Sequence, residues 1–157
     1  MGFIPQRDID VHEIGIRYML EFFPNLQRTT TPDKVTFFSN ANGARVRLKV
    51  DTYDFVNIFI ETHSSIEGEV IGGPWQAAND GCDIYAYYYP RAGQVVLTHL
   101  GPEAMTVLGG LSMVYADRGR IVKNRGYNTR GILLHVNDYL SFMRGFCAVR
   151  TVEPKSI

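Results

Sequence analysis

The chain has 157 residues, of which 45% are hydrophobic and 20% are charged. A chain of this length buries about 70% of its unfolded surface in one core, and this composition excludes a disordered protein. Its 16 basic and 16 acidic residues cancel, which excludes a histone-like polycation. No apolar run reaches the roughly 18 residues that cross a bilayer, and the N-terminal segment lacks the apolar stretch of a signal peptide. We therefore expect one soluble, cytoplasmic domain over residues 1–157, with no membrane partner.

The first third of the chain predicts a helix followed by strands. Apolar residues recur at helical spacing over residues 9–23. Residues 34–38 form an apolar, β-favouring run, and the Asn-Ala-Asn-Gly turn at 40–43 leads directly into a second strand over 45–51. A third strand is expected over 55–63. This part of the sequence predicts a helix packed on a sheet that begins with a hairpin.

Two of these strands alternate between apolar and polar residues. In the second strand Val46, Leu48 and Val50 share one face, and the opposite face carries Arg45, Arg47, Lys49 and Asp51. In the third strand Val56, Ile58 and Ile60 share one face, and the opposite face carries Asn57, Phe59, Glu61 and His63. Two strands that follow each other along the chain therefore each present a polar face.

The rest of the chain continues to mix strands and helices. An irregular Gly-rich segment over 64–81 is expected to be a long loop or a short helix. Cys82 and Cys147 lie beside apolar or aromatic residues, as expected of buried free thiols. The further expected elements are a hairpin of strands at 82–89 and 94–100, a helix at 104–115, a strand at 131–136, a short helix at 137–144 capped by Asn137, and a strand at 146–152. This order predicts an α+β class of fold, with a central mixed β-sheet and flanking helices.

The balanced total charge hides an uneven distribution. Residues 1–90 carry seven bases and twelve acids (7 − 12 = −5), and residues 91–157 carry nine bases and four acids (9 − 4 = +5). Five cations without an intervening acid occupy one short segment: Arg118, Arg120, Lys123, Arg125 and Arg130. Such a run is either a solvated surface loop or an arm that contacts the phosphates of a nucleic acid.

Acidic residues at strand ends suggest metal-assisted phosphodiester cleavage. That reaction needs carboxylates that hold Mg²⁺ and a cation or base that handles the attacking water. Asp33 precedes the first strand, Lys49 and Asp51 share a face of the second, and Glu61 and His63 share a face of the third if the alternation is regular. Each has a structural alternative: Asp33 as a turn residue, Lys49 and Asp51 as an exposed ion pair, and His63 as a capping residue.

The order of these elements resembles the PD-(D/E)XK nuclease superfamily, in particular its small members from phages and other viruses. The similarity covers about residues 9–140 and includes Asp33, Lys49, the NIFIET segment with Glu61, and the Gly73-Pro74-Trp75 segment. The resemblance implies a restriction-endonuclease-like core and a Mg²⁺- or Mn²⁺-dependent nuclease acting on duplex or branched DNA in the host-cell cytoplasm. It also implies that Asp33 is a metal ligand and Lys49 the cation near the scissile phosphate.

Two registers of the family motif remain open, and each has one non-standard residue. In the first, Lys49 is the motif lysine, but Arg47 stands where the family has Asp or Glu. In the second, Asp51 is the motif aspartate and Glu61 and His63 replace the (D/E)xK pair, with His in place of Lys.

The leading hypothesis is a DNA nuclease with four catalytic residues: Asp33, Lys49, Glu61 and His63. Asp33, Asp51 and Glu61 would hold the metal ion, and the segment from Arg118 to Arg130 would hold the DNA backbone. One alternative is a non-catalytic nucleic-acid- or protein-binding relative. Another is an interaction protein that forms a homodimer through its tyrosine-rich strand at 85–89.

Overall fold

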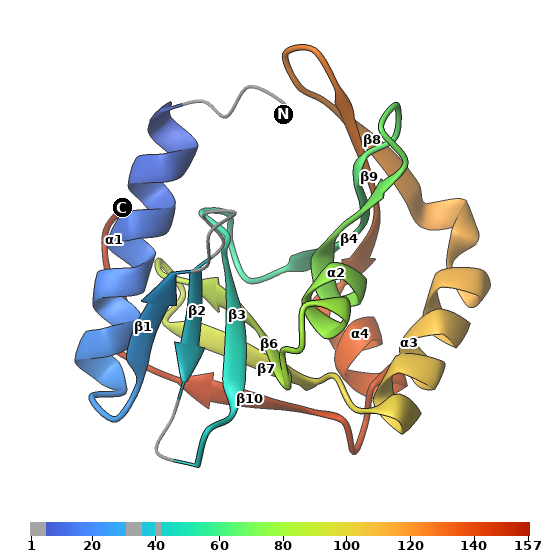
Figure 1. The fold of residues 1–157 in the computed structure, drawn as a ribbon. Coiled ribbons are helices and arrows are strands. Elements are labelled where there is room, and N and C mark those ends of the chain that lie inside the picture. Colours follow the sequence, from blue (N-terminus) through green and yellow to red (C-terminus); the bar gives the residue numbers. More distant parts are fainter. Residues whose placement is uncertain (1–5, 31–35, 40–41) are drawn as a thin grey trace.

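The computed structural model describes residues 6–30, 36–39 and 42–157, which fold around two β-sheets (Figure 1). Within these residues there are four α-helices: α1 (Gln6–Phe22), α2 (Gly73–Asn79), α3 (Pro102–Val114) and α4 (Val136–Phe142), together with the 3₁₀ turn η1 (Ala116–Arg118). The predicted α+β class with a mixed central sheet is confirmed. The restriction-endonuclease-like core stays a prediction.

The central sheet has six strands. It is mixed, because β3 and β6 run parallel and the other neighbouring strands run antiparallel. In spatial order the strands are β1 (Gln27–Thr30), β2 (Thr36–Ser39), β3 (Arg45–Val50), β6 (Ile84–Tyr89), β7 (Gln94–His99) and β10 (Cys147–Thr151). The predicted hairpins β2–β3 and β6–β7 are confirmed by their antiparallel pairing.

The second sheet has four antiparallel strands and contains the third strand predicted from the sequence. In spatial order the strands are β5 (Val70–Ile71), β4 (Asn57–Ser65), β9 (Asn128–His135) and β8 (Gly119–Lys123). β3 and β4 follow each other along the chain but belong to different sheets, so they are not hydrogen-bonded neighbours.

Helix α1 covers one face of the central sheet. Ile16 and Met19 of the helix pack with Val46 and Leu48 of β3, all at most 6% exposed. Spacing near 3.6 on the helix and two on the strand places these apolar residues on facing surfaces, as the sequence predicts.

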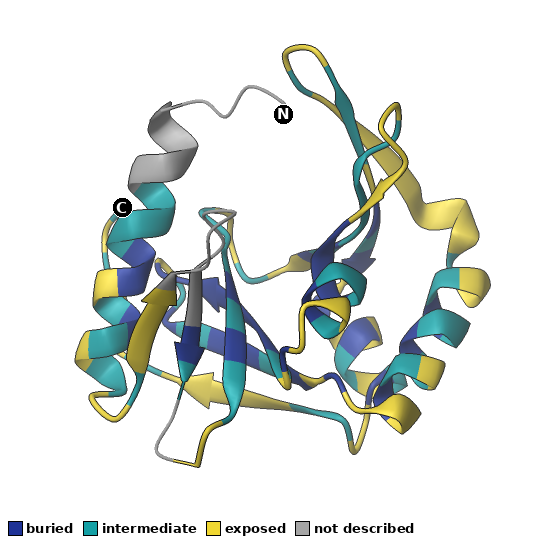
Figure 2. Cartoon of the chain, viewed as in Figure 1, coloured by how far each residue is buried: buried dark blue, intermediate teal, exposed yellow. Residues whose placement is uncertain are grey.

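The opposite face of the central sheet packs against the second sheet. Tyr85, Tyr87 and Tyr89 of β6 share a core with Ile58 and Ile60 of β4, and buried residues of β9, α2, α3 and α4 complete it (Figure 2). Val56, which was expected beside Ile58 and Ile60, precedes β4 and is 50% exposed.

The tyrosine-rich strand was predicted as a dimer edge in one hypothesis, and this prediction is wrong. β6 lies between β3 and β7, so its backbone groups already pair on both sides. Tyr87, Tyr88 and Tyr89 are at most 1% exposed. The aromatic residues of this strand serve the core on both faces of the sheet.

Three local differences from the sequence prediction have clear causes. β1 was not expected, because its Gln-Arg-Thr-Thr sequence has no apolar alternation. The cap of α4 is His135, whose Nδ1 accepts from the Asn137 amide at 3.0 Å, so Asn137 is not the cap. In the segment 64–81 the short helix α2, with Pro74 in its first turn, agrees with one of the two predicted structures, whereas the two-residue strand β5 was not expected.

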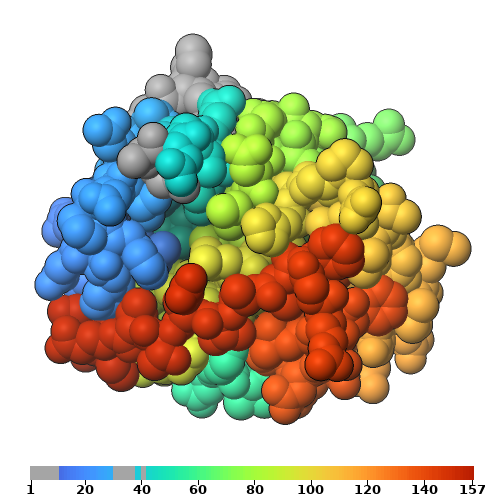
Figure 3. All heavy atoms as spheres, turned by 90° about the horizontal axis from the view of Figure 1, so that it is seen from below, coloured from blue at the N-terminus to red at the C-terminus, as the bar shows by residue number. Residues whose placement is uncertain are grey.

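The C-terminal residues return to α1. Seen from below, the red C-terminal segment runs across the molecule to the blue helix (Figure 3). There the Tyr18 hydroxyl donates to the Ser156 carbonyl oxygen at 3.0 Å, and the Lys155 ammonium lies 5.4 Å from the Tyr18 ring centroid.

Both cysteines are free, with Cys82 buried and Cys147 half-buried. None of the helices in the described part of the chain is long and apolar enough to span a membrane.

Candidate functional site

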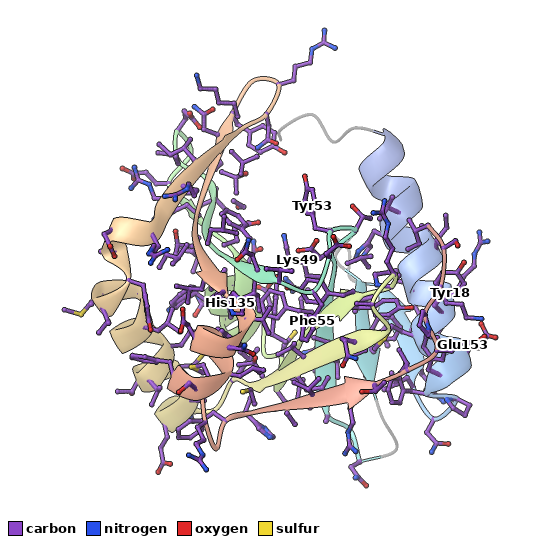
Figure 4. The ribbon with its side chains drawn as sticks, turned by 180° about the vertical axis from the view of Figure 1, so that it is seen from behind. Tyr18, Lys49, Tyr53, Phe55, His135 and Glu153 are labelled. Atoms are coloured by element: carbon purple, nitrogen blue, oxygen red, sulfur yellow. The ribbon has the colours of Figure 1, made fainter. Side chains whose placement is uncertain are left out.

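The polar face of β3 points away from α1. Arg47 and Lys49 pair in register with Tyr85 and Tyr87 of β6, so they project on the side of the sheet that meets the second sheet. The Lys49 ammonium lies 5.9 Å from the centroid of the Phe59 ring on β4. In Figure 4 Lys49 lies on the inner side of the fold, while Tyr53 points away from the core. β3 and β4 therefore meet through side chains.

Asp51 follows β3 and lies in a half-buried position. Its Oδ1 accepts from the Tyr53 amide at 2.8 Å, and its own amide donates to the Tyr88 carbonyl oxygen at 2.8 Å. Burial raises the pKa of the Asp51 carboxyl, opposed by the Tyr53 amide and by the charge of Lys49. The charge of Lys49 thus acts on Asp51, although Asp51 follows the strand in a half-buried position and does not form the exposed ion pair that was one of the expectations.

Glu61 lies beside the turn that begins α2. A Cβ on Gly72 would lie 2.2 Å from Oε1 of Glu61 and 2.7 Å from the amide nitrogen of Ser64, so only glycine fits there. Burial is the largest cause of the raised pKa of Tyr85, and the negative charge of Glu61 is the second largest. The carboxylate is therefore placed near the end of the tyrosine face, against a backbone that approaches very closely.

Asp51 and Glu61 have different neighbours. The charge of Asp51 acts on Tyr89, whose hydroxyl donates to the carbonyl oxygen of Asn57 at 3.0 Å. Glu61 is four residues further along β4, about 13 Å of extended strand. Among the residues that the structure describes, no three His, Cys, Asp or Glu side chains are grouped so that they could hold a metal ion. Asp33, the third predicted ligand, lies outside the described residues.

Arg47, the non-standard residue of the first motif register, contacts the end of α2. Its Nη2 donates to Oδ2 of Asp80 at 2.8 Å, with the side chains 12% and 36% exposed. This ion pair connects the central sheet to the helix that packs on β4. No local pattern predicts this ion pair, because its two residues are 33 positions apart.

A β-bulge separates Glu61 from His63. Glu61 pairs with Gly131 of β9 and His63 pairs with Arg130, so two steps on β4 match one step on β9. Thr62 and His63 both line a surface pocket of about 380 Å³, whose lining does not include Glu61. The prediction that Glu61 and His63 share one strand face assumed a regular alternation, which the bulge interrupts.

The basic segment forms a projecting hairpin of β8 and β9 (Figure 1). Both faces of β8 are exposed (Figure 2). Every cation predicted to contact nucleic acid is exposed: Arg118, Arg120, Lys123, Arg125 and Arg130. Arg120 and Lys123 lie on β8 and Arg130 on β9, whereas Arg118 lies in η1 and Arg125 in the turn between the two strands. Contact of these cations with phosphates stays a prediction.

The hairpin is attached to the strand that carries Glu61. β9 pairs with β8 on one side and with β4 on the other. Glu67, in the turn after β4, accepts from the backbone amide of Asn128 at 2.8 Å and also contacts the Asn128 side chain. The orientation of the basic ribbon is therefore fixed relative to β4.

The pocket beside the bulge contains residues that were not expected to form one site. Trp75 of α2 and Ser112 of α3 line it together with Arg130 of β9, which was predicted to contact the DNA backbone. Trp75 is partly buried and packs against the core as well as lining the pocket. Trp75 lines the pocket because α2, α3 and the second sheet surround one opening, and no local sequence pattern predicts that arrangement.

Comparisons with protein-family models, with curated proteins and with solved structures find no match for this chain.

Proposed function

We propose that this protein binds DNA along the β8–β9 hairpin and hydrolyses phosphodiester bonds with a divalent metal ion. The observation that carries the proposal is the exposed, acid-free basic hairpin, which is hydrogen-bonded to the strand of Glu61. Arg130 is the residue next to Gly131, the partner of Glu61 in the ladder. Phosphates bound along the hairpin would lie next to the strand that carries this carboxylate.

The carboxylates of Asp33, Asp51 and Glu61 are the ligands we assign to Mg²⁺ or Mn²⁺. Carboxylate oxygens suit these hard cations, and a bound ion would activate water and offset the charge on the phosphate. Asp51 and Glu61 have different neighbours, and neither belongs to a group of three ligands among the described residues, so the assignment of one shared ion depends on the metal-binding test below. Lys49, whose charge acts on Asp51, is positioned to stabilise negative charge on the phosphate.

A second candidate function is nucleic-acid binding without cleavage. The ion pair between Arg47 and Asp80 favours it, because the position that the first motif register requires to be acidic carries a cation with a structural contact. In this case the hairpin would bind DNA and the carboxylates would have no catalytic role.

Cleavage of duplex, branched and single-stranded DNA with Mg²⁺ or Mn²⁺ separates the two functions. We expect Glu61→Gln to lower cleavage by about 100-fold or more while leaving DNA binding intact, and excess EDTA to abolish cleavage. Glu103→Gln, an exposed change on α3, is the matched control. Cleavage that persists in EDTA, or at the normal rate in Glu61→Gln, would reject the metal-dependent mechanism. DNA binding with no cleavage of any substrate would select the second function.

The cationic residues distinguish the two motif registers in the same assay. Since Lys49 acts on Asp51 and His63 lines a separate pocket, we expect Lys49→Ala to lower cleavage of duplex DNA by about 100-fold and His63→Ala to change the rate on duplex DNA little. The reverse result would select the register of Asp51, Glu61 and His63.

A further inference from the structure

The pocket of about 380 Å³ opens at the base of the basic hairpin. It lies between α2, the end of α3, and the bulged part of β4 and β9; Trp75, Ser112, Thr62 and His63 contribute to its wall. Gly119, the first residue of β8, and Arg130 of β9 also line it. Its size falls in the range of small-molecule pockets. The same hairpin that we assign to the DNA backbone thus borders a pocket.

The lining combines a mostly apolar surface with a few polar groups. Trp75, Ile71 and Ile132 provide the apolar part. An indole ring is a platform on which any of the four bases can stack. The apolar wall alone would suit many ligands, so the polar groups determine which one fits.

The hydrogen bonds of the bulge fix the tautomer of His63. The Thr62 hydroxyl donates to the Arg130 carbonyl oxygen at 3.1 Å, and its oxygen lies 3.1 Å from Nδ1 of His63. Since the hydroxyl has one proton and has donated it, Nδ1 of the neutral ring carries the hydrogen and donates to Thr62. Nε2 of His63 is then an acceptor.

Two further polar groups complement this acceptor. Ser112 donates its hydroxyl proton to the Gly109 carbonyl oxygen at 2.7 Å, which leaves its oxygen as an acceptor. Arg130 supplies guanidinium donors and is also one of the cations of the hairpin. A nucleobase offers a planar ring with both donors and acceptors on its edge, and it is joined to a phosphate that an arginine can bind.

We infer that this pocket receives one unpaired base of single-stranded DNA, stacked on Trp75, while Arg130 and the rest of the hairpin hold the adjoining phosphates. The inference rests on the proposed function, because it names the kind of DNA that the same hairpin would bind. A base in a duplex is stacked and paired, so only a single-stranded or locally opened substrate would present a base to the pocket.

The chain has one tryptophan, so its fluorescence reports on this pocket directly. A single-stranded oligonucleotide should quench Trp75 fluorescence as it binds. A fully paired duplex of the same length should bind, as followed by the anisotropy of a label on the DNA, with little quenching. Nucleoside monophosphates should quench only at much higher concentration, because each carries a single phosphate whereas a strand offers the hairpin several.

A pocket-filling variant tests the inference without removing Trp75. Ala116 lines the pocket, whereas Met113 is 79% exposed and does not line it. We expect Ala116→Phe to abolish quenching and to weaken single-strand binding about tenfold, as loss of one stacked base predicts. Met113→Phe should leave both unchanged. Trp75→Leu should weaken binding to a similar extent, with circular dichroism as the check on its folding.

The outcomes separate this inference from the proposed function. Salt-dependent binding of single strands without quenching, unchanged in Ala116→Phe, would overturn the base pocket and leave DNA binding in place. Equal quenching by duplex and single strand would overturn the assignment to an unpaired base. Quenching by mononucleotides at the same concentration as by oligonucleotides would show a pocket for free nucleotides. A protein that binds no DNA at all would overturn both proposals.

Discussion

Arg47 and Asp80 join the central sheet to helix α2 through a hydrogen-bonded ion pair of 2.8 Å. The Arg47 side chain is 12% exposed, so its charge is largely removed from water and Asp80 is one of the groups that stabilise it. The position that a nuclease motif would reserve for an acid is therefore used here to hold two elements together.

A double-mutant cycle measures this ion pair. We expect a coupling free energy of about 1 kcal/mol between Arg47→Met and Asp80→Asn, measured by urea unfolding, because the pair is partly buried and hydrogen-bonded. Arg47→Glu should destabilise the fold further, since it places a second carboxylate beside Asp80, and should not raise DNA cleavage. A coupling free energy near zero would show that the ion pair has no structural role. A gain in cleavage by Arg47→Glu would show that Arg47 occupies the position of a lost catalytic acid.

Gly72 and Gly101 are the N-cap residues of α2 and α3, and each of these helices has a proline in its first turn. A Cβ on Gly72 meets Glu61 and a backbone amide, whereas a Cβ on Gly101 meets nothing within 4 Å. Gly72→Ala should therefore lower the free energy of unfolding by about 1–3 kcal/mol and reduce any activity that depends on Glu61. Gly101→Ala, the same change at the same cap position, should cost less than about 1 kcal/mol. Equal effects would mean that Glu61 is free to move away from Gly72.

Local patterns predicted the elements of this fold much better than their assembly. The turn at 40–43 and the alternation around Val46 and Leu48 are signals within a few residues, and the structure confirms the hairpin and the buried face. The assignment of β3 and β4 to different sheets depends on pairings such as Glu61 with Gly131, which are 70 residues apart. No periodicity within one strand specifies such a partner.

The same limit applies to the candidate site. The basic hairpin could be predicted as a charged segment, because its cations are adjacent in sequence. The bulge after Glu61 could not, since a single extra residue leaves no mark in an alternating pattern. That bulge places His63 at the pocket, and the arrangement of Trp75 and Ser112 around it follows from the packing of two helices.

The raised pKa of Asp51 predicts a dependence of stability on pH. Between the unfolded pKa of about 3.9 and the higher folded pKa, the folded state binds more protons than the unfolded state, so stability falls as pH rises through this window. Asp51→Asn keeps an oxygen that can accept from the Tyr53 amide and removes the charge. It should raise the free energy of unfolding at pH 7 and have no effect at pH 3.

Asp54→Asn provides the comparison for this experiment. Asp54 is exposed and lies three residues away, so this change should leave the free energy of unfolding unchanged at both pH values. Destabilisation by Asp51→Asn at pH 7 would show that its charge is stabilised by neighbours more than burial penalises it. A Mg²⁺ ion bound by Asp51 would raise the melting temperature of the wild type and not of Asp51→Asn.

The basic hairpin predicts how DNA affinity depends on salt. If three to five of its cations contact phosphates, the log–log plot of affinity against salt concentration should have a slope of about −3 to −4, measured by fluorescence anisotropy on DNA. Combined replacement of Arg118, Arg120 and Arg125 by Ala should reduce the magnitude of the slope by about three, equally on unrelated sequences, because phosphate contacts do not identify bases. Replacement of Arg150, an exposed arginine on β10, should leave it unchanged.

Removal of the Glu61 carboxylate, which lies beside this surface, should change DNA affinity in the opposite direction. Without metal, Glu61 repels the DNA backbone, so Glu61→Gln should bind DNA as tightly as the wild type or more tightly, while the hairpin variant binds more weakly. This difference in sign distinguishes loss of an acid at the reaction site from loss of a contact that holds the substrate. Weaker binding by Glu61→Gln would mean that Glu61 supports the fold of β4. A wild-type protein without salt-dependent DNA binding would reject the nucleic-acid interface, because exposed cations in a hairpin that contact phosphates must release counterions.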